Sequence, residues 1–159
     1  MQADTDASST NIWPPKIYGA AIVVAGLLTL IVPLRFLGAG TGRETGMDLG
    51  ILIMLASLGF AGWAALAFHR AGTPIQPNRP TTAFITSGPF AYSRNPMYLS
   101  MTAFLFGLAF FADSLWFFLA IPVAMIAVTH LAIAPEEAYL EAKFGDPYRD
   151  YRSKVRRWI

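Results

Sequence analysis

The sequence predicts an all-α integral membrane protein with about four transmembrane helices, a C-terminal helical hairpin among them, a long loop and an amphipathic C-terminal tail. Two observations carry this prediction. Apolar residues make up 55% of the 159-residue chain, only 14% are charged, and the mean hydropathy is +0.46, a balance that soluble domains rarely show. The apolar residues also gather into four runs, each close to the length that crosses a hydrocarbon core about 30 Å thick.

The chain begins with a polar segment, residues 1–16, which carries Asp4 and Asp6. This segment lacks the basic start and the small-residue cleavage site of a secretory signal, so we expect a disordered or surface-lying tail. The remainder, residues 17–159, is predicted to form a single transmembrane domain. Its first span is the uncharged run 17–34, which a glycine-rich polar connection follows.

The second predicted span is residues 49–68, which contain no charge. Ser57, Ala61 and Ala65 recur at every fourth position within it. Small side chains at this spacing form a helix face that permits close contact with another helix. We therefore expect this face to pack against a neighbouring span.

A proline-rich segment, residues 69–97, separates the second span from the third. It contains five of the eleven prolines, so no ordinary transmembrane helix fits there. Its apolar residues, Phe84 and Phe90 among them, argue against disorder, and loops of this length are usually functional. The segment also brings Arg94 to the edge of an apolar run. There a guanidinium is costly unless it lies at the interface, is paired, or faces a polar cavity.

The third and fourth spans are predicted to form an antiparallel helical hairpin. Residues 97–112 and 115–134 are apolar, and Asp113 with Ser114 supplies the polar turn between them. The third run is short for a bilayer. This helix therefore either tilts little or follows a loop that lies within the interface.

A new helix is predicted to begin at Pro135. Proline suits the first position of a helix, and the carboxylates of the next two residues suit the positive end of the helix dipole. Gly145 is expected to cap its C-terminus. The tail that follows mixes tyrosines with basic residues. We expect the tail to lie on the membrane, with aromatic rings in the interface and basic side chains near anionic lipids.

Basic residues are divided unevenly between the two sides of the predicted membrane protein. Four spans put both ends of the chain on one side, which would carry ten of the twelve lysines and arginines, leaving only Arg35 and Arg43 opposite. By the positive-inside rule the termini, the long loop and the tail are then cytoplasmic. Basic residues beside apolar spans also indicate membrane lipids, and not nucleic acid, as partners.

A metal site built by the protein is not expected. The chain contains no cysteine, which excludes disulfide bonds and thiolate ligands. Its two histidines, His69 and His130, are too few for an ordinary zinc site.

Three motifs follow one another in a family-like order. They are Gly88-Pro89-Phe90 with Arg94-Asn95-Pro96-Met97-Tyr98, then Glu136-Glu137 after the hairpin, then Phe144-Gly145-Asp146-Pro147-Tyr148-Arg149-Asp150-Tyr151. Over residues 86–157 this order and spacing resembles the C-terminal signature of the isoprenylcysteine carboxyl methyltransferase and phospholipid methyltransferase families. The resemblance implies an integral membrane enzyme that takes a methyl group from S-adenosylmethionine. Asn95 stands where the isoprenylcysteine enzymes usually have histidine, a departure that bears on the substrate and not on the family.

This resemblance, together with the chemistry of S-adenosylmethionine, indicates a cofactor site within residues 69–159. The molecule carries a carboxylate, an amino group, a sulfonium and an adenine, so its site needs both signs of charge and apolar or aromatic contacts. Arg94 suits a carboxylate, whereas a glutamate suits amino or ribose hydroxyl groups. His130 lies seven residues before Glu137, which puts both near one helical face. We predict Arg94 and Glu137 as catalytic residues, and a cofactor site formed by Arg94, Asn95, Pro96, Tyr98, His130, Glu136, Glu137, Tyr148 and Tyr151.

The same residues are also compatible with simpler roles and with different functions. Arg94 and the two tail tyrosines can be interface anchors, and a glutamate can simply cap the predicted helix. Sterol reductases that use NADPH share a related Arg-x-Pro-x-Tyr pattern, but in much longer chains. A small four-span transporter is also conceivable, although it would be expected to carry a carboxylate within a span, and the four predicted spans contain none.

The acceptor of the methyl group is predicted to be small or lipidic. A carboxylate or thiol is favoured, because no pair of residues marks a general base that would take a proton from an amine. Methylation of a phospholipid amine is the alternative, since the phospholipid enzymes resemble the chain about as well.

Overall fold

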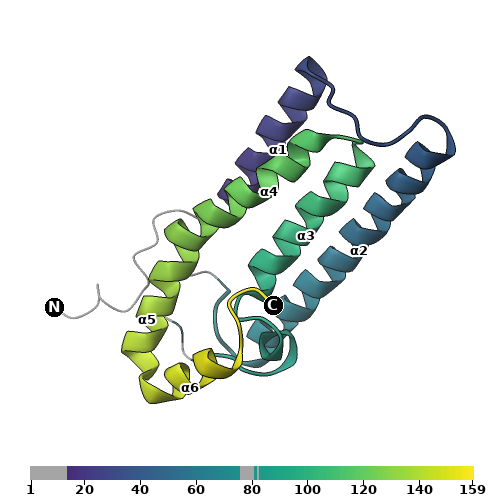
Figure 1. Ribbon diagram of the computed structural model, residues 1–159. Helices are drawn as coiled ribbons and strands as arrows, with labels where there is room; N and C mark the ends of the chain where they lie inside the picture. Colours follow the sequence, from purple (N-terminus) through teal and green to yellow (C-terminus); the bar gives the residue numbers. More distant parts are fainter. Residues whose placement is uncertain (1–13, 76–80, 82) are drawn as a thin grey trace.

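The computed structural model describes residues 14–75, 81 and 83–159, and its regular elements in this part of the chain are all helical (Figure 1). In chain order they are α1 (Pro14–Ile31), α2 (Thr41–Arg70), a 3₁₀ turn (Gly88–Ala91), α3 (Pro96–Phe111), α4 (Leu115–Val128), a π turn (Thr129–Ile133), α5 (Ala134–Phe144) and α6 (Asp146–Lys154). The all-α prediction is confirmed. Most of the expected polar tail, residues 1–16, lies outside the described residues. The first described residue, Pro14, already belongs to α1.

The predicted apolar helices are present, with shifted boundaries. Three helical stretches are long and apolar enough to cross a membrane, namely α1, α2 and the continuous stretch Leu115–Phe144, whereas α3 is apolar but shorter. α2 begins before the predicted residue 49, because Gly40 turns the chain with φ 71° and Glu44 places a carboxylate in the first helical turn. Large apolar side chains such as Leu30, which is 82% exposed, cover the outer surface, as expected of helices that face lipid.

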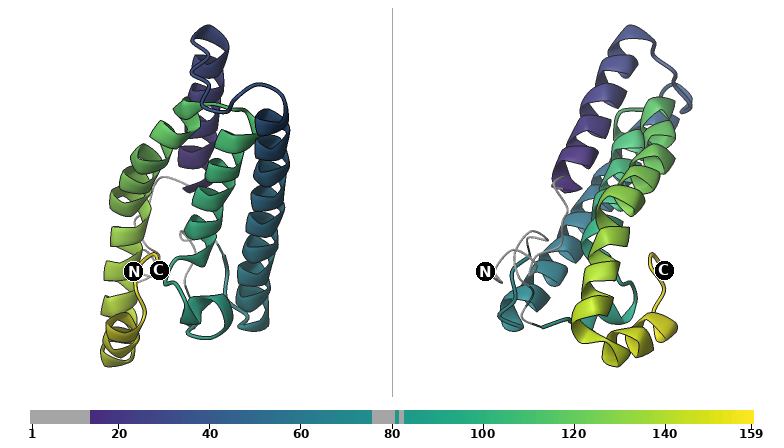
Figure 2. Two further views of the ribbon diagram at one scale, coloured as in Figure 1. Left: turned by 45° about the vertical axis from the view of Figure 1, so that its right-hand side comes forward. Right: turned by 90° about the vertical axis from the view of Figure 1, so that its left-hand side faces the viewer.

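The helices pack around a hairpin. α3 and α4 form the predicted antiparallel pair, α2 lies along α3, and α1 lies along α4 (Figures 1 and 2). Leu105, Ala109, Val128 and Ile133 are fully buried between them. The two helices of the hairpin are antiparallel. The start of α3 and the last turns of the stretch Leu115–Phe144, called the fourth helix below, therefore emerge at the same end of the bundle.

The fourth helix does not stop where the sequence predicts. The sequence favours a new helix at Pro135, but the chain continues from α4 through the π turn into α5 as one helical stretch of 30 residues (Figure 2). In a regular α-helix the proline ring would clash with the carbonyl of Leu131, four residues earlier. A π turn, whose hydrogen bonds span five residues, widens the helix locally and accommodates the ring. The stretch is about 45 Å long, so α5 extends beyond a hydrocarbon core about 30 Å thick.

The tail folds back onto the protein and does not lie on the membrane through its tyrosines. Gly145, with φ 60°, ends α5 as predicted, and α6 turns toward the bundle (Figure 2). Tyr148 and Tyr151 are only 2% and 9% exposed, so the prediction that they sit in the lipid interface is wrong. The rings are buried because Phe84 and Phe90 of the long loop contact them. The loop and the tail therefore pack together.

The opposite end of the bundle is held by Asp113. This residue is buried, and its Oδ1 accepts hydrogen bonds from the backbone N–H groups of Phe36 at 3.0 Å and Leu37 at 2.8 Å. The N–H of Leu115 also donates to the carbonyl of Leu34 at 2.9 Å. The predicted turn residue therefore ties the α1–α2 connection to the hairpin. We refer to this end as the turn end and to the end that carries α5 and α6 as the tail end (Figure 1).

α2 and α3 come into close backbone contact at two glycines. A Cβ atom on Gly50 would lie 2.5 Å from the nitrogen of Phe111 and 2.7 Å from the oxygen of Gly107. Of the predicted small face only Ser57 is buried, and the alanines at 61 and 65 are half-buried. Small residues do permit the close contact, but they are glycines nearer the turn end.

We predict that Gly50→Ala lowers the stability of the folded bundle by about 1–3 kcal/mol, because the added methyl group must push two helix backbones apart. Gly59→Ala in the same helix is the matched control, since no atom lies within 4 Å of its Cβ position. The control should be neutral or slightly stabilising through higher helix propensity. Thermal unfolding in detergent measures the difference, and equal transition temperatures for the two variants would contradict the contact.

Candidate active site

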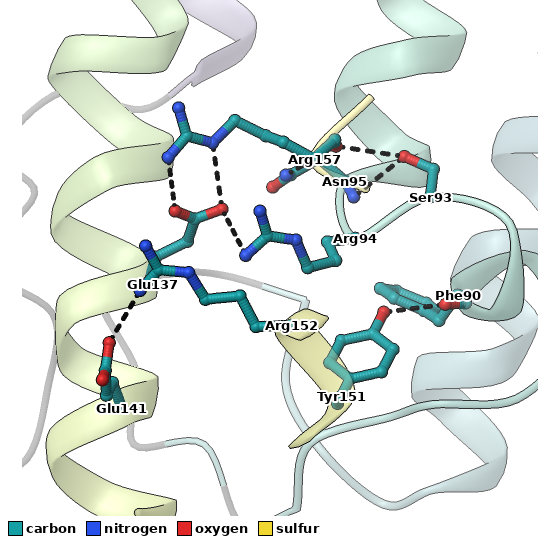
Figure 3. Close-up of polar contacts among 9 residues, drawn as sticks. All are labelled: Phe90, Ser93, Arg94, Asn95, Glu137, Glu141, Tyr151, Arg152 and Arg157. Carbon is teal, nitrogen blue, oxygen red and sulfur yellow. Dashed lines mark hydrogen bonds and ion pairs between the residues drawn. The ribbon is translucent and has the colours of Figure 1, made fainter. Parts of the chain in front are cut away.

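A buried carboxylate between two arginines forms the centre of the tail end (Figure 3). Oε1 of Glu137 lies 3.1 Å from Nη1 of Arg94. Arg157 donates to both oxygens of Glu137, from Nε to Oε1 at 3.1 Å and from Nη2 to Oε2 at 2.7 Å. The side chains of Arg94 and Glu137 are only 10% and 8% exposed. One charged cluster thus joins the long loop, α5 and the segment after α6.

The last residues of the chain fix the loop that carries Arg94. The N–H of Arg94 donates to the carbonyl of Arg156 at 3.0 Å. The carbonyl of Arg157 accepts from Oγ of Ser93 at 3.3 Å and from Nδ2 of Asn95 at 3.0 Å. These bonds satisfy polar groups that an irregular buried loop would otherwise leave without partners. They also hold the Arg94 side chain in one direction, toward α5.

Aromatic rings enclose one side of the cluster. Oη of Tyr151 donates to the carbonyl of Phe90 at 2.7 Å, and the ring of Phe84 lies 4.9 Å from that of Phe144 and 5.9 Å from that of Tyr148. Burial raises the pKa of both tyrosines, and the charge of the neighbouring arginine only partly offsets this. Both phenols therefore keep their protons at neutral pH; Tyr151 donates its proton to Phe90, whereas the Tyr148 oxygen accepts a hydrogen bond from Arg94.

The charged cluster opens into a cavity with mixed walls. One part of the lining is polar and ionic and the other is aromatic, and it includes Phe84, Phe90, Arg94, Glu137, Tyr148 and Tyr151. Such a combination suits a ligand that has both charged groups and a flat ring.

A second, more apolar cavity adjoins the first. Met97, Met101 and Tyr98 contribute to its walls, and it shares Arg94 and Glu136 with the first cavity. Oη of Tyr98 donates to Oε2 of Glu136 at 3.1 Å. A hydrogen-bonded carboxylate therefore stands where the two cavities meet.

Arg94 is incompletely bonded for so buried a group. Its Nε and Nη1 atoms are buried and make no hydrogen bond within the part of the chain that the structure describes, although Nη1 forms the ion pair with Glu137. A buried donor without an acceptor costs about 1–3 kcal/mol. Groups of this kind are rare in folded proteins, and a bound ligand is one way in which they are satisfied.

The structure places most of the predicted site residues around the two cavities. Arg94, Asn95, Glu136, Glu137, Tyr148 and Tyr151 line the first cavity, and Pro96 and Tyr98 line the second. His130 does not join them, because it is exposed and lines neither cavity. The prediction assumed a regular helix between His130 and Glu137. A π turn holds more residues per turn than an α-helix, so a separation of seven residues no longer brings His130 to the face of Glu137.

Arg157, Phe84 and Phe90 were not among the predicted site residues, although Phe84 and Phe90 line the first cavity and Arg157 binds Glu137. The sequence indicated only that Arg157 belonged to a basic tail near lipid. Its pKa is raised mainly by the hydrogen bonds to Glu137, so it stays charged. Arg157 is one of six basic residues in the last stretch of the chain, and no local pattern distinguishes it from the other five.

Comparison with known proteins agrees with a methyltransferase. The phospholipid methyltransferase family matches residues 46–147, which include α3, the fourth helix and most of the candidate site. The chain belongs to this family, and its apolar helices agree with a membrane methyltransferase. An uncharacterized protein of Haemophilus influenzae is 40% identical over 63 residues, which cover 40% of this chain and all of the relative. No solved structure matches the chain.

Proposed function

We propose that the protein transfers a methyl group from S-adenosylmethionine to a small or lipidic acceptor at the membrane interface. The observation that carries the proposal is the buried guanidinium of Arg94: this residue lines the first cavity, and its Nε and Nη1 atoms make no hydrogen bond to a described residue. The carboxylate of the cofactor's methionine part supplies the missing acceptor. A planar guanidinium is well suited to a carboxylate, since it presents two parallel donors.

The remaining walls fit the other parts of the same molecule. Glu136 and Glu137 supply negative charge for an amino group or hydrogen bonds for ribose hydroxyl groups. The rings of Phe84 and Tyr148 offer apolar faces for an adenine. When bound, S-adenosylmethionine supplies an electrophilic methyl group on a positively charged sulfur.

Methyl transfer mainly requires alignment and a dry site, because a near-attack geometry replaces a bimolecular encounter. Arg94 would orient the cofactor, and Glu137 would hold Arg94 in place through the ion pair of 3.1 Å. Burial of the cluster keeps water from the reacting atoms. Glu136 and Tyr98 lie at the junction of the cavities, between the proposed cofactor and the proposed acceptor.

The second cavity is the proposed place of the acceptor. It continues, through Met97 and Met101, into an apolar groove between α1, α2 and α3 that includes Tyr18 and Phe104. A lipidic acceptor could enter the site laterally by this route. The apolar walls leave only the reacting head group in contact with charged residues.

The sequence favours a carboxylate or thiol acceptor because it shows no general base. The Tyr98–Glu136 pair provides a carboxylate at the cavity junction, and it supports the second candidate, methylation of a phospholipid amine. A protonated amine must lose its proton before its lone pair can attack, and Glu136 is placed to accept that proton. The family match also favours this second candidate.

The transfer can be tested with radiolabelled S-adenosylmethionine and a membrane extract. We expect the wild-type protein to label a small or lipidic product, and we expect Arg94→Gln to lose at least about 90% of the activity, since one charged hydrogen bond is worth about 1.5–3 kcal/mol. Base treatment then separates the acceptor classes, because methyl esters release volatile methanol whereas methylamines retain the label. If the wild type labels nothing and binds no S-adenosylmethionine, the proposed function is wrong.

We also propose that both termini and the tail end face the cytoplasm, on the basis of the uneven distribution of lysine and arginine. The chain has no cysteine, so single cysteines can report on either side. Arg43→Cys at the turn end should react with a membrane-impermeant maleimide in intact cells, and Lys154→Cys at the tail end should react only after lysis. Both positions are exposed. The reverse pattern would overturn the orientation.

A further inference from the structure

The charged cluster holds two guanidinium groups and one carboxylate between them. Arg157 takes both oxygens of Glu137 in a bidentate pair, with N···O distances of 3.1 and 2.7 Å. Arg94 approaches only Oε1, which Arg157 already uses. Figure 3 shows the two arginines on neighbouring sides of the same carboxylate. Arg157 is therefore the main partner of Glu137, and Arg94 is the second.

This unequal division leaves Arg94 with unused donors. A carboxylate and a guanidinium normally prefer a fork of two parallel hydrogen bonds. Arg94 cannot form that fork with Glu137 while Arg157 occupies both oxygens. Its Nε and Nη1 atoms are buried and make no hydrogen bond to any described residue. Arg94 also lines the first cavity.

We propose that Arg157 is a positioning residue: it keeps Glu137 from pairing bidentately with Arg94, and so keeps the Arg94 guanidinium available for the carboxylate of the cofactor. This inference rests on the proposed function, and it assigns to the end of the chain a part in cofactor selection. Arg157 itself lines neither cavity. Its effect on the ligand passes through Glu137 and Arg94.

The main chain and the side chain of Arg157 have separate tasks. Its carbonyl accepts hydrogen bonds from Ser93 and Asn95, which fixes the loop beside Arg94. Trp158, the next residue, packs against the hydrophobic core and holds this segment in place. A substitution that changes only the side chain keeps these contacts. It therefore tests the ion pairing with Glu137 and not the docking of the tail.

Loss of the Arg157 charge leaves both oxygens of Glu137 without their main hydrogen-bond donor. The carboxylate is only 8% exposed and cannot turn to water, so it must satisfy both oxygens within the cluster. Arg94 is the charged partner that remains in contact with it. A bidentate Arg94–Glu137 pair would then form, and the donors of Arg94 would be withdrawn from the ligand's carboxylate.

Binding of two related ligands distinguishes this role from a general structural one. S-adenosylhomocysteine carries the amino-acid carboxylate and amino group, whereas 5′-methylthioadenosine has the same adenosine and thioether with neither. We expect Arg157→Gln to weaken S-adenosylhomocysteine by about tenfold or more and to leave methylthioadenosine within about twofold, as measured by calorimetry on the purified full-length protein in detergent. Arg94→Gln should show the same selective loss.

Two further variants serve as controls. Lys154→Gln removes one positive charge from an exposed position of the same tail, and it should bind both ligands as the wild type does. Arg157→Lys restores the charge without the fork, so its affinity for S-adenosylhomocysteine should be intermediate. Thermal unfolding of each variant shows whether the fold is retained, and Arg157→Lys provides the comparison if Arg157→Gln does not fold.

The inference is overturned if Arg157→Gln or Arg157→Lys binds S-adenosylhomocysteine as tightly as the wild type. It is also overturned if the affinities for both ligands fall by the same factor, because a damaged site would not distinguish them by their carboxylate. Failure of the wild type to bind either ligand is a different result, and it would overturn the proposed function itself.

Discussion

The carboxylate of Glu137 is the group on which the tail end depends. It is almost fully buried, and two arginines from segments far apart in the sequence bind it. Breaking such a pair from one side leaves an uncompensated buried charge, which typically costs about 3–5 kcal/mol. The pairing adds little net stability compared with an apolar contact of the same size, but it specifies which segments meet. The long loop and the tail both meet α5 at this side chain.

The geometry of the hairpin makes that meeting possible. The turn at Asp113 returns the chain along α3, and the fourth helix then runs past the start of α3 because it is longer than its partner. Without the π turn, Pro135 would end or kink the helix near the bilayer surface. With it, the helix carries Glu136 and Glu137 beyond the apolar core to the level of Arg94. Apolar packing of the helices thus sets how far α5 extends past the start of α3, and the ion pairs with Glu137 set the positions of the arginine side chains.

The two cavities indicate which ligands this arrangement could bind. Arg94 and Glu136 belong to both of them, one with unused donors and the other with a tyrosine hydroxyl bound to it. A ligand with a carboxylate and an adenine suits the first cavity, and an acceptor with an apolar body suits the second. The reacting atoms would then meet at the shared residues, away from water and from the lipid.

The sequence predicted the apolar helices and most of the candidate residues that line the two cavities, because both depend on residue type and spacing. Uncharged runs mark spans, and the motif order brought Arg94 and Glu137 together once the hairpin was assumed. It did not predict the continuous fourth helix, since Pro135 followed by two glutamates is equally a helix-start pattern. The misplacement of His130 followed from that error. Arg157 could not be predicted because its role depends on the path of the tail, and the close contact at Gly50 and Gly107 depends on helix register.

The central claim is that S-adenosylmethionine lies between the long loop and the stretch from α5 to α6. Photolabelling with an 8-azido analogue of S-adenosylmethionine, followed by digestion and mass spectrometry, tests it most directly. The account predicts label in peptides from residues 83–94 and from residues 136–151, and loss of that label when excess S-adenosylhomocysteine competes. Competed label confined to the turn end, in residues 32–48 or 112–116, would contradict it.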